Sequence, residues 1–504
     1  MEKKLNMPRR LIYLILAIFF LLSSCSGAGL PELTAAAPTV VPNPSALTSR
    51  TAISASSGIL TVTPTIPFSP VSTQIPPPIS VRPLYTLNAS LDYASHSIAV
   101  DETIFYRNSS GVTLPELVLA VEPNIWAGSF VMGGVLINGQ NPGKISLAGD
   151  RLVVPLGNPL VPGGSLTMSI QYNLHLPAAD RHHLFGFNTR QINLVDWYPF
   201  IVPYSGGWIL HPPADVGEHL TYDVADFDVT VTLVAPSIPI VLAASAPAEM
   251  SPGSWHYHLQ NVRTFVLSAS PSYKTVSITN GGVTITSYFF SGDESPAGAV
   301  LDATTRAVII YGDIFGSYQH SSLSTVESPF FDGMEYDGLF FLSQEYYASY
   351  DGTLLNNLVD IAVHETAHQW WFGLVGNDQA MEPWLDEALA TYSEELFYEK
   401  NLPQISAWWK FRVESFSPAG WVDTDIYDGV NFRIYANAVY LRGAQFLEAL
   451  RKKIGDGAFF AFLKDYAIQM SGKRATAEDF FSILGTHTSV NILDLISSYF
   501  QHPQ

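Results

Sequence analysis

Hydrophobic and polar residues alternate with a period of two along much of the chain from residue 81 to residue 290. The alternation is clearest at residues 228–233 and 283–289, and turn residues such as Pro-Gly-Gly at 162–164 interrupt it. A period of two places successive side chains on opposite faces of a strand, so that one face can be buried. We therefore expect residues 81–290 to form an all-β sandwich domain.

The period changes to about 3.6 after a short polar stretch that begins at residue 291. Residues 297–318 and most of the chain from residue 356 onward have the spacing of amphipathic helices. A strand-like stretch at residues 339–342 lies between them. This pattern predicts a second, mainly α domain of the α+β kind at residues 291–504.

The first 25 residues have the character of an export signal. Lysines and arginines precede an apolar run at residues 11–22, which is too short to span a bilayer comfortably. The run ends in Leu-Ser-Ser-Cys at residues 22–25, which resembles the bacterial lipoprotein box, where a cysteine is acylated and becomes the mature N-terminus. We expect residues 1–25 to be a lipoprotein signal peptide, with lipidation at Cys25. An ordinary cleaved signal with an incidental cysteine and an uncleaved signal anchor are the alternatives.

Residues 26–80 are rich in proline, threonine, serine and alanine and carry almost no charge. Such a segment cannot bury enough apolar surface to offset the entropy of ordering it, and its prolines favour extended conformations. We interpret it as a semi-stiff linker that holds the folded part of the chain away from a membrane. The expected location is therefore extracytoplasmic, at a membrane surface to which the lipid anchors the protein.

Composition and charge limit the classes of partner. Hydrophobic residues make up 47% of the chain and aromatic residues 12%, which is typical of a globular protein rather than a disordered one. The formal net charge of −20 argues against nucleic acid, because phosphate backbones attract basic surfaces. The single cysteine excludes an intrachain disulfide. We expect no nucleic acid among the partners.

The clearest chemical signal is His364-Glu365-Thr366-Ala367-His368. The surrounding apolar residues fit a helix, so the four-residue spacing places both imidazoles on one face. Two neutral imidazoles one turn apart can bind the same Zn²⁺, and Glu365 lies beside them, where a metal-bound water would sit. His364 and His368 are therefore the first two expected ligands of one zinc ion per chain.

A second helical segment at residues 382–392 offers the third ligand that such a site needs. Its Glu387 follows His368 by 19 positions, and two helices joined by the loop at residues 373–379 can pack antiparallel and bring the carboxylate to the metal. Other histidine pairs in the β region, at 182–183 and at 256 and 258, are weaker metal candidates, because exposed or capped histidines are far commoner.

These two segments together carry a family resemblance. H-E-x-x-H, then eighteen residues, then Glu within W-L-x-E-x-x-A-x-Y, resembles the M1 aminopeptidase family of gluzincins. The resemblance covers about residues 81–500 and implies an N-terminal β-sandwich followed by a thermolysin-like α+β catalytic domain. It then stops, so we expect a form that lacks the large C-terminal helical domain of many members and has a more open site.

Gly333-Met334-Glu335-Tyr336 is similar to the family signature G-x-M-E-N, with Tyr where Asn is usual. In that signature the glutamate binds the free α-amino group of the substrate. The resemblance therefore implies that Glu335 binds the substrate ammonium, with Gly333 and Met334 as further substrate-binding residues.

Tyr440 matches the catalytic tyrosine of the family's Y-x-K/R-G segment, although Leu441 replaces the acidic residue common there. Tyr435 is the nearest alternative. Tyrosine on an amphipathic helix is more often a packing residue than a catalytic one, so the assignment of Tyr440 rests on the resemblance.

The resemblance implies a zinc-dependent metallopeptidase, an aminopeptidase that releases N-terminal residues from peptides. Glu365 would assist the attack of zinc-bound water, and Tyr440 would hydrogen-bond the oxyanion. One alternative is an endopeptidase or another hydrolase on the same scaffold, which requires that Glu335 does not bind a substrate ammonium. Another is a catalytically inactive peptide-binding lipoprotein, which the presence of Glu365 disfavours, because zinc binding alone does not require that residue.

Overall fold

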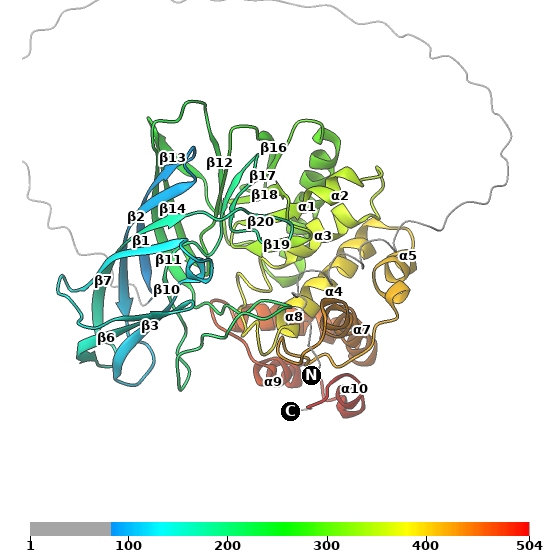
Figure 1. Cartoon of the computed structure of the whole chain (residues 1–504). Helices are drawn as coiled ribbons and strands as arrows, with labels where there is room; N and C mark the ends of the chain where they lie inside the picture. The colour runs from blue at the N-terminus through cyan, green and yellow to red at the C-terminus, as the bar shows by residue number, and fades with distance from the viewer. Residues whose placement is uncertain (1–81, 503–504) are drawn as a thin grey trace, which may run out of the picture. The chain divides into compact units, whose positions relative to one another are not determined.

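The computed structural model describes residues 82–502. The predicted signal peptide at residues 1–25, which includes Cys25, and the predicted linker at residues 26–80 lie outside the described residues. Within the described part, strands dominate up to residue 289, and helices dominate from residue 294 onward (Figure 1). This order confirms the predicted fold class, a β-sheet region followed by a mainly α catalytic region.

The largest sheet among the described residues has seven strands in the order β13-β14-β11-β1-β2-β7-β4. Strands β2 and β7 pair antiparallel with Val100 opposite Tyr172, and both side chains are buried on the same face. The strands of this sheet are β1 (Leu84–Asp92), β2 (Ser97–Arg107), β4 (Phe130–Ile137), β7 (Ser165–His175), β11 (Ala225–Leu233), β13 (Ala248–Ser251) and β14 (Ser254–Val262). Buried and exposed side chains alternate along these strands, as the period of two predicted, so the sheet has one buried face and one open face.

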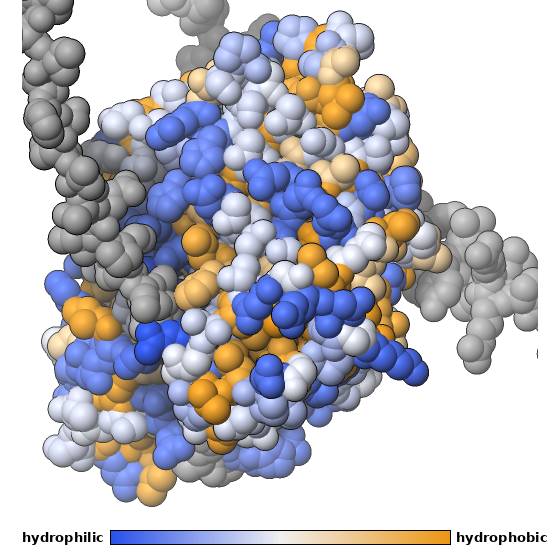
Figure 2. Space-filling view, turned by 90° about the vertical axis from the view of Figure 1, so that its left-hand side faces the viewer, coloured by the Kyte–Doolittle hydropathy of each residue, from blue (hydrophilic) through white to orange (hydrophobic). Residues whose placement is uncertain are grey.

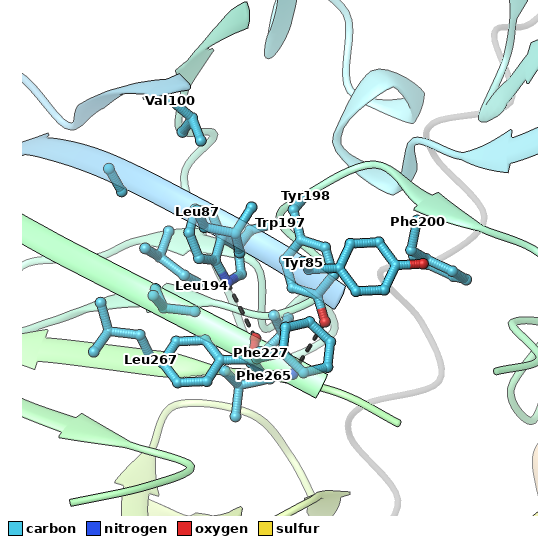
Figure 3. Packing of buried hydrophobic residues seen from close by; sticks show 14 of the residues in the cluster. Tyr85, Leu87, Val100, Leu194, Trp197, Tyr198, Phe200, Phe227, Phe265 and Leu267 are labelled. Atoms are coloured by element: carbon cyan, nitrogen blue, oxygen red, sulfur yellow. Dashed lines mark hydrogen bonds between the residues drawn. The ribbon is translucent and has the colours of Figure 1, made fainter. Parts of the chain in front are cut away.

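Two smaller sheets share a hydrophobic core with the large one. In this core, Trp197 Nε1 donates to the Phe265 carbonyl oxygen at 3.2 Å, and the Phe265 amide donates to Tyr198 Oη at 3.0 Å (Figure 3). The sheets have the orders β10-β3-β6-β5 and β12-β15-β9-β8. Their strands are β3 (Leu114–Ala120), β5 (Ser146–Ala148), β6 (Arg151–Leu160), β8 (Gly186–Phe187), β9 (Ile192–Leu194), β10 (Phe200–Ile201), β12 (Val241–Ala244) and β15 (Leu267–Ser270).

The open face of the seven-stranded sheet carries polar side chains. Asn88, Asp101, Gln171 and Thr230 line a shallow hollow on it, and Gln171 Nε2 donates to Asp101 Oδ1 at 2.7 Å. Figure 2 shows the side of the molecule that lies to the left in Figure 1, where hydrophilic residues are interspersed with hydrophobic ones. The polar positions of the alternating pattern therefore lie on the solvent side of the sheet.

The catalytic region contains a five-stranded sheet in the order β16-β17-β18-β20-β19, counted over the described residues. Its strands are β16 (Lys274–Asn280), β17 (Val283–Phe289), β18 (Ser322–Ser328), β19 (Gly333–Tyr336) and β20 (Leu339–Ser343). Strand β17 pairs parallel with β18, so β16 and β17 belong to this sheet and not to the sandwich that we predicted to extend to residue 290. The alternating pattern cannot separate the two, because it reports one buried face and not the partner strand.

Helices cover the catalytic sheet and extend beyond it (Figure 1). They are α1 (Glu294–Phe315), α2 (Gln344–Ala348), α3 (Asn357–Ala367), α4 (Trp384–Asn401), α5 (Ser406–Trp408), α6 (Phe432–Ala436), α7 (Arg442–Ile454), α8 (Asp456–Gln469), α9 (Ala477–His487) and α10 (Leu493–Tyr499). Helix α1 ends at Phe315, earlier than the predicted residue 318, because Gly316 takes a φ of 119°. Among the described residues, no helix combines the length and apolarity needed to cross a membrane.

Candidate active site

Helix α3 carries the two predicted histidine ligands on one face. Asn356 caps its first turn, with Oδ1 accepting from the Val359 amide at 3.2 Å. His364 lies in the last turn and His368 at the C-cap, and their Nε2 atoms come within 3.1 Å of each other. Both side chains are buried. Two Nε2 atoms at this separation fit two ligands of one metal ion.

Glu387 reaches the same point from the first turn of helix α4. Its Oε2 lies 3.2 Å from Nε2 of His364 and 3.6 Å from Nε2 of His368. The three donor atoms lie within 4.8 Å of one another, and all three side chains are buried. Two imidazole nitrogens and one carboxylate oxygen are a ligand set that zinc takes in catalytic sites, so these residues fit the predicted metal.

The other nitrogen of each histidine ring has a protein partner. Nδ1 of His364 lies 2.8 Å from Glu394 Oε1, and Nδ1 of His368 lies 2.8 Å from the carbonyl oxygen of Trp371. A hydrogen bond at Nδ1 fixes the ring orientation and leaves Nε2 unprotonated for a metal. Both histidines are thus set in the tautomer that metal binding requires.

Glu394 is a site residue that the sequence analysis missed. Arg412 donates to both of its carboxylate oxygens, at 2.8 and 2.9 Å, and Arg412 Nε also lies 3.0 Å from Asp360. Burial raises the pKa of Glu394, but Arg412 and His364 bring it below the ordinary value, so the carboxylate is charged. Glu394 follows Glu387 by seven positions on one face of α4, a spacing that could have singled it out.

Glu365 lies on α3, against Gly333 of the edge strand β19. A Cβ at Gly333 would stand 2.1 Å from Glu365 Oε1, so glycine at this position makes room for the carboxylate. Oε2 of Glu365 is buried without a hydrogen-bond partner in the described structure, and burial raises the pKa of Glu365 well above its ordinary value. Met334, the next residue of β19, is half-buried against the core of the β region. The sequence-predicted general base is therefore placed beside the predicted ligands.

Three carboxylates form a second group next to the metal ligands, two of them buried and one half-buried. The group consists of Glu218, Glu335 and Asp386, which offer oxygens within 4.8 Å of one another. Gln379 Nε2 donates to both glutamates. Burial raises the pKa of all three carboxyls, and the negative charges of their neighbours add to the effect. Three acidic groups this close together favour a cation beside them.

Glu218 was also missed, because no motif or periodicity marks the loop that carries it. Gly217 takes a φ of 66°, and a Cβ there would stand 2.7 Å from Tyr435 Oη, so only glycine allows this close approach. The residue after Glu218 is His219, and its Nε2 lies 3.2 Å from Glu122 Oε2 and 3.9 Å from Asp150 Oδ2. Burial lowers the pKa of His219, but Glu122 and Asp150 raise it overall, and the imidazole between these two carboxylates anchors the loop.

Tyr440 lies on a π-helical turn (Asn437–Leu441) between α6 and α7. Its hydroxyl donates to Glu387 Oε1 at 2.5 Å, and its ring stacks on His364 with centroids 6.0 Å apart. Tyr435, the alternative, packs edge-on against Tyr440 at 5.9 Å and is buried. Tyr440 is the tyrosine whose hydroxyl reaches a predicted metal ligand. Single π turns are frequent at functional sites.

The described site has a counterpart among known families. Residues 300–499 match the model of the peptidase family M1 domain. Aminopeptidase M1-C of Oryza sativa subsp. japonica is 24% identical over 242 residues, which are 44% of this chain and 27% of that protein. Aminopeptidase N of Lactobacillus delbrueckii subsp. lactis is 26% identical over 223 residues, which are 40% of this chain and 26% of that protein. The chain thus spans about a quarter of the length of these curated relatives.

Solved structures cover more of the chain. An M1 zinc metallopeptidase from Deinococcus radiodurans has a TM-score of 0.59 at 21% identity, over 81% of this chain and 91% of that one. A mutant from the same organism, bound to a Tyr-Ser-Ala substrate, has a TM-score of 0.60 at 19% identity, over 84% of this chain and 95% of that one. These likenesses establish the fold across both regions. Together with the ligand geometry above, the match at residues 300–499 identifies this part of the chain as a peptidase family M1 domain.

Proposed function

We propose that this chain is a zinc-dependent aminopeptidase that releases N-terminal residues from peptides. The observation that carries the proposal is the position of the carboxylates of Glu218, Glu335 and Asp386 beside the zinc-type ligand set. A peptide's free ammonium relieves the repulsion among these carboxylates, whereas an internal stretch of peptide leaves it uncompensated. The carboxylate group therefore favours substrates with a free N-terminus, and the likeness to a structure bound to Tyr-Ser-Ala supports a peptide substrate.

His364, His368 and Glu387 would hold the zinc. When bound, zinc supplies a Lewis acid that polarises a carbonyl and lowers the pKa of water. Glu365 accepts a proton from the attacking water and returns it to the leaving amine, because its Oε2 has no hydrogen-bond partner among the described residues. The Tyr440 hydroxyl donates a hydrogen bond to the oxygen on which negative charge develops. Glu335 and Glu218 hold the substrate ammonium.

An aminoacyl anilide and its N-acetyl form test the choice of substrate. The proposal predicts rapid hydrolysis of the free amine and little or none of the acetylated form. Equal hydrolysis of both would show an endopeptidase or another hydrolase on the same scaffold. If zinc-loaded protein cleaves no peptide amide and Glu365→Gln changes nothing, the chain is an inactive peptide-binding protein.

We also propose that the chain is exported and held at a membrane surface outside the cytoplasm by a lipid on Cys25. The signal-like residues 1–25 and the uncharged, proline-rich residues 26–80 support this location. Metabolic labelling with a fatty acid, followed by membrane fractionation, tests the idea. Wild-type protein should carry the label and sediment with membranes, and Cys25→Ser should lose both properties. Equal sedimentation without label would favour an uncleaved signal anchor.

A further inference from the structure

Arg263 of the β region donates hydrogen bonds to three main-chain carbonyl oxygens, two of them in the catalytic region and one in the β region. Arg263 follows strand β14 and is buried. Its Nε donates to the carbonyl oxygen of Phe372 at 2.6 Å, Nη1 to that of Tyr222 at 2.9 Å and Nη2 to that of Lys473 at 2.7 Å. Its own amide donates to Asp337 Oδ2 at 2.8 Å. Arg263 is therefore held at its main chain and at its guanidinium, and the guanidinium fixes the three carbonyls around it.

The Phe372 carbonyl belongs to the turn that follows the zinc-ligand helix. Phe372 has a φ of 139°, a conformation that a residue with a Cβ rarely adopts and that its surroundings must hold in place. Its amide donates to the Val375 carbonyl at 2.9 Å. The residue before it, Trp371, supplies the carbonyl that lies 2.8 Å from Nδ1 of His368. The orientation of His368 thus depends on a strained turn.

We propose that Arg263 is a positioning residue for the metal site, an inference that rests on the proposed zinc function. By holding the Phe372 carbonyl, Arg263 keeps the strained turn closed. The turn keeps the Trp371 carbonyl opposite Nδ1 of His368, and that hydrogen bond directs Nε2 toward the metal. The β region then contributes directly to zinc affinity, in addition to supplying Glu218 beside the metal ligands.

Two variants perturb the arginine in different ways. Arg263→Lys keeps the charge but loses the planar group that reaches three carbonyls. Gly376→Ala keeps Arg263 itself, but its Cβ would stand 2.4 Å from Arg263 Cζ and push the guanidinium away. Arg190→Met is the matched control, because Arg190 also joins the two regions, through Glu327 at 3.3 Å and Gln344 at 2.5 Å, but not the turn.

The readout is the dissociation constant of zinc, measured by competition with a chelator on the full-length protein well below its unfolding temperature. Both Arg263→Lys and Gly376→Ala should weaken zinc binding about 10- to 100-fold, the range for loss of an orienting partner of a ligand. Arg190→Met should lower thermal stability and leave zinc affinity unchanged. Wild-type affinity in the first two variants, or an equal loss in the control, overturns the inference. A wild-type protein that binds no zinc overturns the proposed function instead.

Discussion

Glu394 Oε1 lies 2.8 Å from Nδ1 of His364, and Arg412 holds the same carboxylate with two hydrogen bonds. The imidazole is therefore placed between a charged carboxylate on one side and the metal position on the other. Glu394 is buried and its pKa is held below the ordinary value, so its charge persists at neutral pH. A carboxylate in this position increases the basicity of a histidine ligand and fixes its tautomer.

Replacement of Glu394 by glutamine should weaken zinc binding. The amide keeps the size of the side chain but loses the charge that supports the imidazole, so we expect the dissociation constant of zinc to rise about 10- to 100-fold. Chelator competition measures this. Glu395→Gln, one position further along α4, is the control, since Glu395 faces Arg451 and not His364. Equal zinc affinity in Glu394→Gln and wild type would contradict the role of Glu394.

Tyr440→Phe should slow turnover and leave substrate affinity almost unchanged. The hydroxyl is expected to stabilise charge that develops only during the reaction, so kcat should fall on the order of a hundredfold, with KM nearly constant. Zinc content is checked in parallel, because Tyr440 also contacts Glu387. Tyr435→Phe removes a hydroxyl from the same aromatic pair and should change kcat only a few-fold. A larger loss in Tyr435→Phe would move the catalytic role to Tyr435.

Glu218→Gln should reduce selectivity for a free N-terminus. Loss of one charged partner of the substrate ammonium corresponds to about 1.5–3 kcal/mol, or roughly a 10- to 100-fold lower kcat/KM for an aminoacyl anilide. Any residual activity on the N-acetyl form should not change. Glu249→Gln, at an exposed position of β13, serves as the control for charge alone. A loss of the same size on both substrates would show that Glu218 acts on the fold or the metal and not on the ammonium.

Glu395 makes stability depend on pH. Burial, together with Glu399 and Glu448, raises its pKa to about 8 in the folded chain. Between its unfolded pKa, about 4.5, and this value, the folded state binds more protons than the unfolded state, so stability falls as pH rises, by at most about 1.4 kcal/mol per pH unit. Glu395→Gln should therefore gain stability relative to wild type at pH 8 compared with pH 5. Urea unfolding of both proteins at pH 5 and pH 8 measures their free energies of unfolding. The prediction would be refuted if the variant and wild type differed in stability by the same amount at both pH values.

Periodicity and spacing predicted the parts of the molecule that local sequence determines. The alternation in β2 and β7 predicted a sheet with one buried face, and the four-residue spacing of His364 and His368 predicted two ligands on one helix face. Glu387 was predicted from its place 19 residues after His368, because two helices joined by a loop can pack antiparallel and bring the carboxylate to the metal. These features depend on neighbours that are close in sequence.

The parts that the sequence did not predict depend on tertiary packing. Glu218 and Arg263 lie in the β region far along the chain from α3, and only the folded structure brings them to the site. Strand β17 alternates like a sandwich strand, yet it pairs with β18 of the catalytic sheet. A pattern of buried positions reports that a face is covered but not which segment covers it, so the predicted boundary at residue 290 was too late.

The proposed zinc site would act on the free N-terminus of peptides. An unmodified decapeptide and the same peptide acetylated at its N-terminus are incubated with zinc-loaded wild type and with Glu365→Gln, and mass spectrometry identifies the products. We expect successive loss of N-terminal residues from the unmodified peptide alone, stopped by a chelator. We also expect turnover about 100- to 10,000-fold slower in the variant, at equal zinc content. Internal fragments, or equal digestion of the acetylated peptide, would contradict this proposal.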